Sequence, residues 1–218
     1  MLFHQAVSTL PLFENAKVAQ MQKHVRQFVE IAARTLPLIE PIYEFGSMQV
    51  QNGDSEADLR SIFRGRSYVG SDFRSGPGVD KVLNLHDIQE MDGSIGTVIC
   101  VDTLEHVEYP RRAMQELYRV LQNDGVAIIS SVMNFPIHGY PNDYWRFTPE
   151  GFRSLLNVFD GHFVGSCGSD PSFPQTIVGI GFKTKTPDIE AFHAEYAKWE
   201  LRNNNLMKFL QEQEQGAL

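Results

Sequence analysis

The chain has 218 residues, which is comfortable for one globular domain with a sizeable core and short for two. Its formal net charge of -8 argues against a nucleic-acid partner, because affinity for a phosphate backbone depends on clustered Lys and Arg. No stretch approaches about 18 consecutive apolar residues, and the N-terminus lacks the basic start and apolar run of a signal peptide, so we predict a cytoplasmic protein with no membrane span.

Helical patterns frame an alternating middle region. Residues 13–35 place apolar side chains at helical spacing, and Pro37 and Pro41 interrupt that pattern. At the other end, the Gln- and Asn-rich segment 188–215 predicts one amphipathic helix or a pair. Between these ends the sequence predicts strands at 42–45, 67–71, 81–85, 96–101, 126–132, 162–167 and 175–183 and helices at 110–121 and 148–159.

Strands that alternate with helices imply an α/β fold with a parallel, doubly wound sheet and helices on both faces. No composition shift or linker divides the chain, so we predict a single domain. Its parts are an N-terminal helical extension or lid over residues 1–40, a sheet core over 41–185 and a helical tail over 186–218. The two cysteines, Cys100 and Cys167, lie in apolar surroundings typical of buried thiols, which excludes a disulfide framework.

Carboxylates follow the first four predicted strands. In doubly wound sheets, ligands bind beyond the carboxyl ends of the strands. The residues found there are Glu44, Asp72, Asp87 and Asp102. One acidic strand end is unremarkable, since Asp favours turns, but four at the same rim favour a binding site.

Asp72 is the candidate for contact with a ribose. A carboxylate at the end of the second strand, about 20–30 residues beyond the first turn, can accept both hydrogen bonds of a ribose diol. The alternative is a turn-forming Asp before the Gly-Pro-Gly segment at 76–78.

The turn after the first strand indicates which adenosine cofactor is bound. A diphosphate needs several backbone N–H groups brought close by glycines, and here Met48 and Val50 add bulk before the next glycine, Gly53. S-adenosylmethionine has no phosphate, and it needs only close approach at Gly46 and a carboxylate such as Glu44 near its ammonium group. The turn therefore favours S-adenosylmethionine.

Residues 98–132, VICVDTLEHVEYPRRAMQELYRVLQNDGVAIISSV, are similar to the fourth strand, acidic-His turn, helix, Gly turn and fifth strand of class I S-adenosylmethionine-dependent methyltransferases of the type 11 kind. The resemblance covers about residues 40–185. At the first motif the chain departs from the family pattern E/D-x-G-x-G-x-G and keeps only Glu44 and Gly46. The resemblance implies a Rossmann-like, seven-stranded, mostly parallel sheet whose last strand is antiparallel, with extra N- and C-terminal helices.

The resemblance also implies a set of cofactor contacts and no metal site. Glu44 and Gly46 would contact the methionine moiety, and Asp102 and Thr103 would flank the sulfonium. The ribose would bind Asp72, and the adenine would contact the remaining set, which is Phe73, Asp87 and the Ile88 backbone. A cationic sulfonium suits an acidic rim, since nearby carboxylates offset its charge.

The loop after the fifth strand, residues 133–147, is the candidate acceptor site. Its Trp, Tyr and Arg side chains together favour a planar, sugar-like or anionic group. We predict substrate contacts from His138, Trp145 and Arg146 and catalytic roles for Asp143 and Tyr144. In the alternative, Trp145 and Phe147 anchor the loop in the core while Arg146 pairs with Asp143.

His106 is the candidate general base. It follows the sulfonium end of the predicted site, and a His titrates near neutral pH. The alternative is that His106 packs or caps where the chain LEHV leads into the next helix.

The sequence as a whole predicts an S-adenosylmethionine-dependent methyltransferase for a small polar or sugar-like acceptor, acting as a monomer or homodimer. Two alternatives stay open. One is a non-catalytic binding protein, supported by the reduced first motif. The other is an NAD(P)-dependent oxidoreductase, although the chain lacks both a glycine-rich diphosphate turn and a Tyr-x-x-x-Lys pair.

Overall fold

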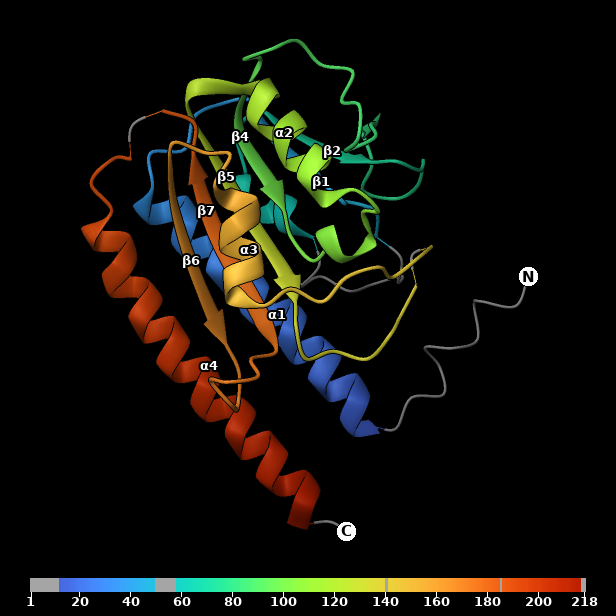
Figure 1. The fold of residues 1–218 in the computed structure, drawn as a ribbon, viewed down its shortest axis with the longest axis vertical. Helices are drawn as coiled ribbons and strands as arrows, with labels where there is room; N and C mark the ends of the chain where they lie inside the picture. Colours follow the sequence, from blue (N-terminus) through green and yellow to red (C-terminus); the bar gives the residue numbers. More distant parts are fainter. Residues whose placement is uncertain (1–11, 50–57, 140, 185, 217–218) are drawn as a thin grey trace.

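The computed structural model describes residues 12–49, 58–139, 141–184 and 186–216 (Figure 1). Val50 and Gly53, which follow the first predicted strand, and Tyr140 of the 133–147 loop lie outside these ranges. No helix among the described residues is long and apolar enough to span a bilayer.

One seven-stranded sheet, in the order β3-β2-β1-β4-β5-β7-β6, organises the chain. The strands are β1 (Ile42–Phe45), β2 (Tyr68–Asp72), β3 (Lys81–Val82), β4 (Ile95–Cys100), β5 (Leu121–Val132), β6 (Gly161–Cys167) and β7 (Thr176–Phe182). The first five strands pair in parallel, and β7 runs antiparallel to both of its neighbours. The predicted Rossmann-like, mostly parallel sheet with an antiparallel last strand is confirmed.

Helices cover both faces of this sheet (Figure 1). They are α1 (Leu12–Thr35), α2 (Pro110–Val120), α3 (Pro149–Leu156) and α4 (Glu190–Gly216), with short 3-10 turns η1 (Leu59–Phe63) and η2 (Leu104–His106). Alternate strand residues face opposite layers: Val98 and Cys100 of β4 pack toward α2 and α3, whereas Ile99 packs toward α1 and α4. The continuous apolar run of β4 and β5 therefore reflects burial on both sides.

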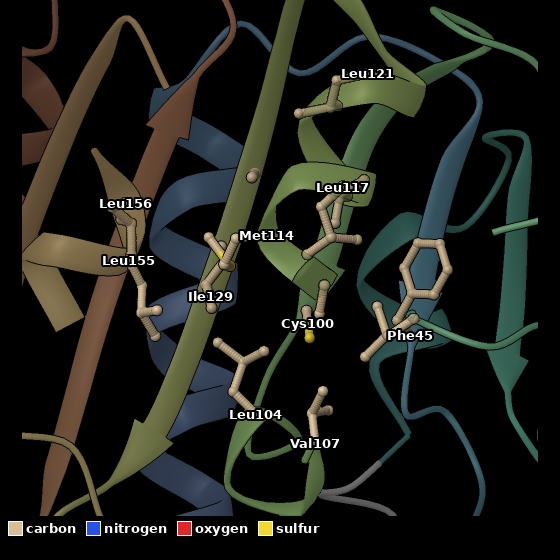
Figure 2. Packing of buried hydrophobic residues seen from close by; sticks show 14 of the residues in the cluster. Phe45, Cys100, Leu104, Val107, Met114, Leu117, Leu121, Ile129, Leu155 and Leu156 are labelled. Atoms are coloured by element: carbon tan, nitrogen blue, oxygen red, sulfur yellow. The ribbon is translucent and has the colours of Figure 1, made fainter. Parts of the chain in front are cut away.

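The α2–α3 side of the core also supports the end of β4. Figure 2 shows Met114 and Leu117 of α2 beside Cys100 and Ile129 of the central strands. Leu104, from the η2 turn, is fully buried in the same cluster. The core thus fixes the turn that carries the acidic residues after β4.

On the other face, α1 and α4 pack together against the sheet. Trp199 of α4 is 1% exposed, its Nε1 donates to the His24 carbonyl at 2.9 Å, and its ring lies 5.6 Å from that of Phe28. The helical stripe of Phe192, Tyr196 and Trp199 is buried as an ordinary core contact. From Val25 onward, the described part of α1 packs its apolar side chains against this face of the sheet.

Two strands differ from their predicted bounds by three residues or more. β3 ends at Val82 instead of residue 85, because its partner β2 ends at Asp72 and leaves the following residues without a neighbour to pair with. β5 begins at Leu121 instead of residue 126. Its turn-like stretch QNDG is accommodated as a register shift, since Leu121 pairs with Ile95 and Val126 pairs with Thr97.

Glu44 is a buried carboxylate within the sheet. Its side chain is on the same strand face as Ile42, which belongs to the α1–α4 side, and it accepts a hydrogen bond from the Tyr68 hydroxyl. Burial raises the Glu44 pKa from 4.5 to about 7, with Asp58 and Arg60 of the η1 region as its charged neighbours. This position is inside the protein layer, so the structure does not place Glu44 toward a ligand at the rim.

We expect Trp199→Ala to lower the free energy of unfolding by about 3–5 kcal/mol, because it removes a fully buried indole from the α1–α4 interface. Leu201→Ala is the matched control: Leu201 is in the same helix but 64% exposed, so its loss should change stability by no more than about 0.5 kcal/mol. Urea unfolding followed by circular dichroism measures both. Equal effects would contradict the packing described.

Glu44→Gln should stabilise the protein above pH 7. A raised folded-state pKa contributes stability that is fully present below about pH 4.5 and is lost as pH rises to about 7. Gln keeps an acceptor for Tyr68 but cannot ionise, so the variant should gain up to about 3 kcal/mol over the wild type above pH 7, and the gain should fade toward pH 4.5. Urea unfolding at several pH values checks this. Glu150→Gln, at a side chain that is 82% exposed, should not reproduce the trend.

Candidate functional site

A cavity of about 310 Å³ opens at the carboxyl ends of β1, β2 and β4. Its walls come from the segments that follow the first four strands and from the loop after β5. This is the edge of a doubly wound sheet at which strand order reverses, here between β1 and β4.

Five of the eight predicted cofactor residues line this cavity. They are Gly46, Asp72, Phe73, Asp102 and Thr103. Glu44, Asp87 and Ile88 do not line it. The structure thus brings five of the predicted cofactor residues to one cavity and places the other three outside its wall.

The turns after β1 and β4 meet at Gly46. This glycine has a φ of +89°, and a Cβ built on it would lie 2.1 Å from the Thr103 hydroxyl oxygen. That hydroxyl donates to the Val101 carbonyl at 2.8 Å. Asp102, which stands between Val101 and Thr103 in the chain, has a left-handed φ of 44°. The glycine requirement at residue 46 thus comes from contact between two protein turns, in addition to any ligand.

Asp72 faces the cavity beside Arg74 and Phe73. Its Oδ1 accepts from the Arg74 backbone N–H at 2.9 Å, and the Arg74 Nε lies 3.6 Å from the same oxygen. The Arg74 guanidinium also lies over the Phe73 ring, 4.8 Å from its centroid. A carboxylate can accept about four hydrogen bonds, so these contacts leave Asp72 acceptor capacity for a diol.

The structure places Asp87 and Ile88 outside the cavity wall. Asp87 is an exposed turn residue, and the Ile88 backbone N–H donates to Glu116 at 2.9 Å, so it is not offered to an adenine edge. Because β3 ends three residues earlier than predicted, the chain leaves the sheet earlier, and residues that precede Asp87 reach the cavity. The residues that take these places in the cavity wall are Asn84, Leu85 and His86.

Two acidic side chains follow β4, and the sequence analysis named only one of them. Ser130 donates to Asp102 and Ser131 donates to Glu105, each at 2.7 Å. Burial is the main cause that raises the pKa of both carboxyl groups to about 7, and for Asp102 the neighbouring Glu105 contributes to that rise. Glu105 is 1% exposed, and its place between Asp102 and His106 in the acidic-His turn was the available signal.

Arg146 and Asp143 form a forked ion pair in the loop after β5. The two oxygen–nitrogen distances are 2.5 and 2.6 Å, and Arg146 also donates to the carbonyls of Phe135 and Pro136 at 3.0 and 2.8 Å. Burial would raise the Asp143 pKa, but bonds from Arg146 and the His138 backbone hold it at about 2. Neither partner lines the cavity. The structure thus gives Arg146 the pairing role that the sequence analysis kept as the alternative to substrate contact.

The same loop docks on the η2 turn. The backbone N–H groups of Tyr144 and Trp145 donate to the Glu105 carbonyl at 2.8 and 3.2 Å, and the Trp145 Nε1 donates to the Val107 carbonyl at 2.9 Å. Tyr144 lines the cavity, whereas Trp145, although 42% exposed, does not. Phe147 is buried and anchors the loop in the core.

His106 and His138 lie side by side at the loop–turn contact. Their ring centroids are 4.7 Å apart, and His106 lines the cavity. The His106 Nδ1 is 2.6 Å from the Asn142 carbonyl, and the His138 Nδ1 is 3.1 Å from the Pro136 carbonyl. Burial, together with His106, lowers the His138 pKa. The structure therefore brings together two residues that the sequence assigned to separate roles.

Comparison with known proteins adds a match to a family model over part of the chain and a shared fold. Residues 72–129 match the family model of a methyltransferase domain. No curated protein matches the sequence.

Similar solved structures share the fold at low sequence identity. The 1,6-didemethyltoxoflavin-N1-methyltransferase of Burkholderia thailandensis, solved with 1,6-didemethyltoxoflavin and S-adenosylhomocysteine, is 14% identical with a TM-score of 0.58, covering 78% of this chain and 83% of that one. The methyltransferase CalH, in complex with S-adenosylhomocysteine, is 17% identical with a TM-score of 0.56, covering 77% and 58%. The cyclase SpnF is 11% identical with a TM-score of 0.54, covering 74% and 82%.

These likenesses establish the fold, and the family match falls on the segment from the end of β2 through most of β5 that builds much of the cavity. Together they confirm the resemblance drawn from the sequence. The chain thus has the fold of these solved methyltransferases, and its residues 72–129 match the model of a methyltransferase domain.

Proposed function

We propose that this protein is an S-adenosylmethionine-dependent methyltransferase that acts on a small polar or sugar-like acceptor. The main support is that residues from three different strand ends line one cavity in this fold: Gly46, Asp72, Asp102 and Thr103. The cavity volume of about 310 Å³ lies at the lower end of the range for small-molecule sites. We further propose that the chain works as a single cytoplasmic domain, with residues 1–40 and 186–218 as extensions of the 41–185 core.

The residues present fit this cofactor. Asp72 would accept hydrogen bonds from the ribose diol, and the exposed face of Phe73 would lie against the adenine. Asn84 and His86 offer polar groups for the adenine edge. At the other end, Asp102 would attract the sulfonium charge.

When bound, the cofactor supplies an electrophilic methyl group whose transfer leaves a neutral thioether. The protein must hold the acceptor in line with that group and exclude water. Tyr144 and Asn142 form the wall on the loop side of the cavity, so they are placed to position the acceptor. His106, also in this wall, would remove the proton that a hydroxyl acceptor loses.

SpnF, a cyclase, has this fold as well, so the fold alone does not set the reaction. Release of S-adenosylhomocysteine across a panel of sugars, nucleotide sugars and small hydroxylated metabolites tests both the activity and the acceptor class. A folded protein that binds neither S-adenosylmethionine nor S-adenosylhomocysteine would refute the proposal.

Asp72→Ala should weaken S-adenosylmethionine binding by about 1.5–3 kcal/mol, because hydrogen bonds from the ribose to a charged group are lost. Isothermal titration measures the change. Asp87→Ala is the control, since Asp87 is an exposed carboxylate that follows the neighbouring strand but does not line the cavity. Equal affinities of the two folded variants would contradict the ribose role.

His106→Ala should keep the affinity for S-adenosylmethionine within about threefold but lower turnover by about 10²–10⁴-fold if the imidazole removes the acceptor proton. Rates of S-adenosylhomocysteine release with the acceptor found by screening provide the measurement. His162→Ala, in β6 and outside the cavity wall, should keep full turnover. Full turnover of His106→Ala would instead show that His106 only packs.

A further inference from the structure

Three metal-ligating side chains come together where the β5 loop docks on the η2 turn. One potential ligand atom from each of Glu105, His106 and His138 lies within 4.8 Å of the other two. The turn supplies Glu105 and His106, and the loop supplies His138 from 32 residues further along the chain. Two imidazoles and one carboxylate are a donor set of zinc and other first-row divalent ions.

Hydrogen bonds orient both imidazoles. The His138 Nδ1 is 3.1 Å from the Pro136 carbonyl and 3.2 Å from the Asp143 carboxylate, and the His106 Nδ1 is 2.6 Å from the Asn142 carbonyl. Facing these acceptors, Nδ1 is the protonated nitrogen, so Nε2 is the nitrogen that would present a lone pair to an ion. Nδ1–H bonds to carbonyl or carboxylate oxygens are the outer contacts that metal-binding histidines make.

The carboxylates around the cluster are held as well. Ser131 donates to the Glu105 Oε2 at 2.7 Å, and a carboxylate has further lone pairs with which it would bind an ion. Asp143, which supports His138, is itself fixed by the fork from Arg146. The Arg146–Asp143 pair therefore has a place in this arrangement although it does not line the cavity.

We propose that Glu105, His106 and His138 form a binding site for a divalent first-row transition-metal ion at the acceptor side of the cavity. Bonds of about 2.0–2.2 Å put ligand atoms at most about 4.4 Å apart, so the side chains close slightly around the ion. Three protein ligands leave coordination positions open. His106 lies in the cavity wall, so an open position is available to a ligand there.

The role of the ion rests on the proposed function, but its binding does not. An ion held here would coordinate an oxygen of the acceptor, lower the pKa of its hydroxyl group and favour loss of the proton to solvent before methyl transfer. The site therefore selects acceptors with a metal-binding hydroxyl or carboxylate. His106 would then act as a ligand instead of a base, and because both roles predict lower turnover on its removal, ion binding must be measured directly.

The test uses the full-length protein with any affinity tag removed. Titration with Co²⁺ should give visible absorption bands that saturate at one ion per chain, and Zn²⁺ should displace it. Glu105→Gln and His138→Ala should each weaken binding at least tenfold, and Asp143→Asn should weaken it about 10–100-fold through His138. His162→Ala and His193→Ala remove histidines outside the cluster and should bind as the wild type does.

Circular dichroism establishes that each variant is folded. The proposal is overturned if the wild type binds no ion at this stoichiometry, or if folded Glu105→Gln and His138→Ala bind as tightly as the controls. Titration with S-adenosylmethionine in the presence of a chelator separates the two proposals. Donor binding without an ion site would sink only the metal proposal, and an ion site without donor binding would sink only the methyltransferase.

Discussion

The close contact between the turns after β1 and β4 is the constraint on which the cavity depends. Gly46 and Thr103 approach so closely that no side chain can be added at residue 46 without displacing Thr103. The contact brings the ends of two adjacent strands together and directs Asp102 toward the opening with a left-handed backbone. A single glycine, Gly46, is sufficient for this contact between the two turns.

The second determinant is the way the 133–147 loop is fixed. Its only strongly buried aromatic side chain among the described residues is Phe147, so the loop depends on polar contacts for its shape. The Arg146 side chain donates hydrogen bonds to carbonyl groups of the loop itself. Two backbone N–H groups of the loop donate to the Glu105 carbonyl. Glu105, in the turn after β4, thus fixes the loop-side wall of the cavity through its backbone carbonyl, and its buried side chain lies near that of Asp102.

The sequence was sufficient for the sheet and for most of the rim. β1 was predicted to the residue, because its apolar run is bounded by Pro41 and Gly46. β3 was predicted too long, because Leu83 and Leu85 continue a strand-like alternation whose pairing stops where β2 ends. The contact of His106 with His138 could not be predicted, since it depends on long-range closure of a loop that local patterns do not describe.

The order of strands along the sheet has a consequence for how the chain folds during synthesis. β7 lies between β5 and β6, so β6 emerges from the ribosome before the strand that joins it to the sheet exists. α1, made first among the described helices, keeps an uncovered apolar face until α4 emerges. All the residues that line the cavity have been synthesised by residue 144. The strands β6 and β7 and the helix α4, which complete the sheet edge and cover α1, are made only afterwards. For a period during synthesis, the nascent protein therefore already contains all the residues that line the cavity, while its core is still open to solvent and to chaperones.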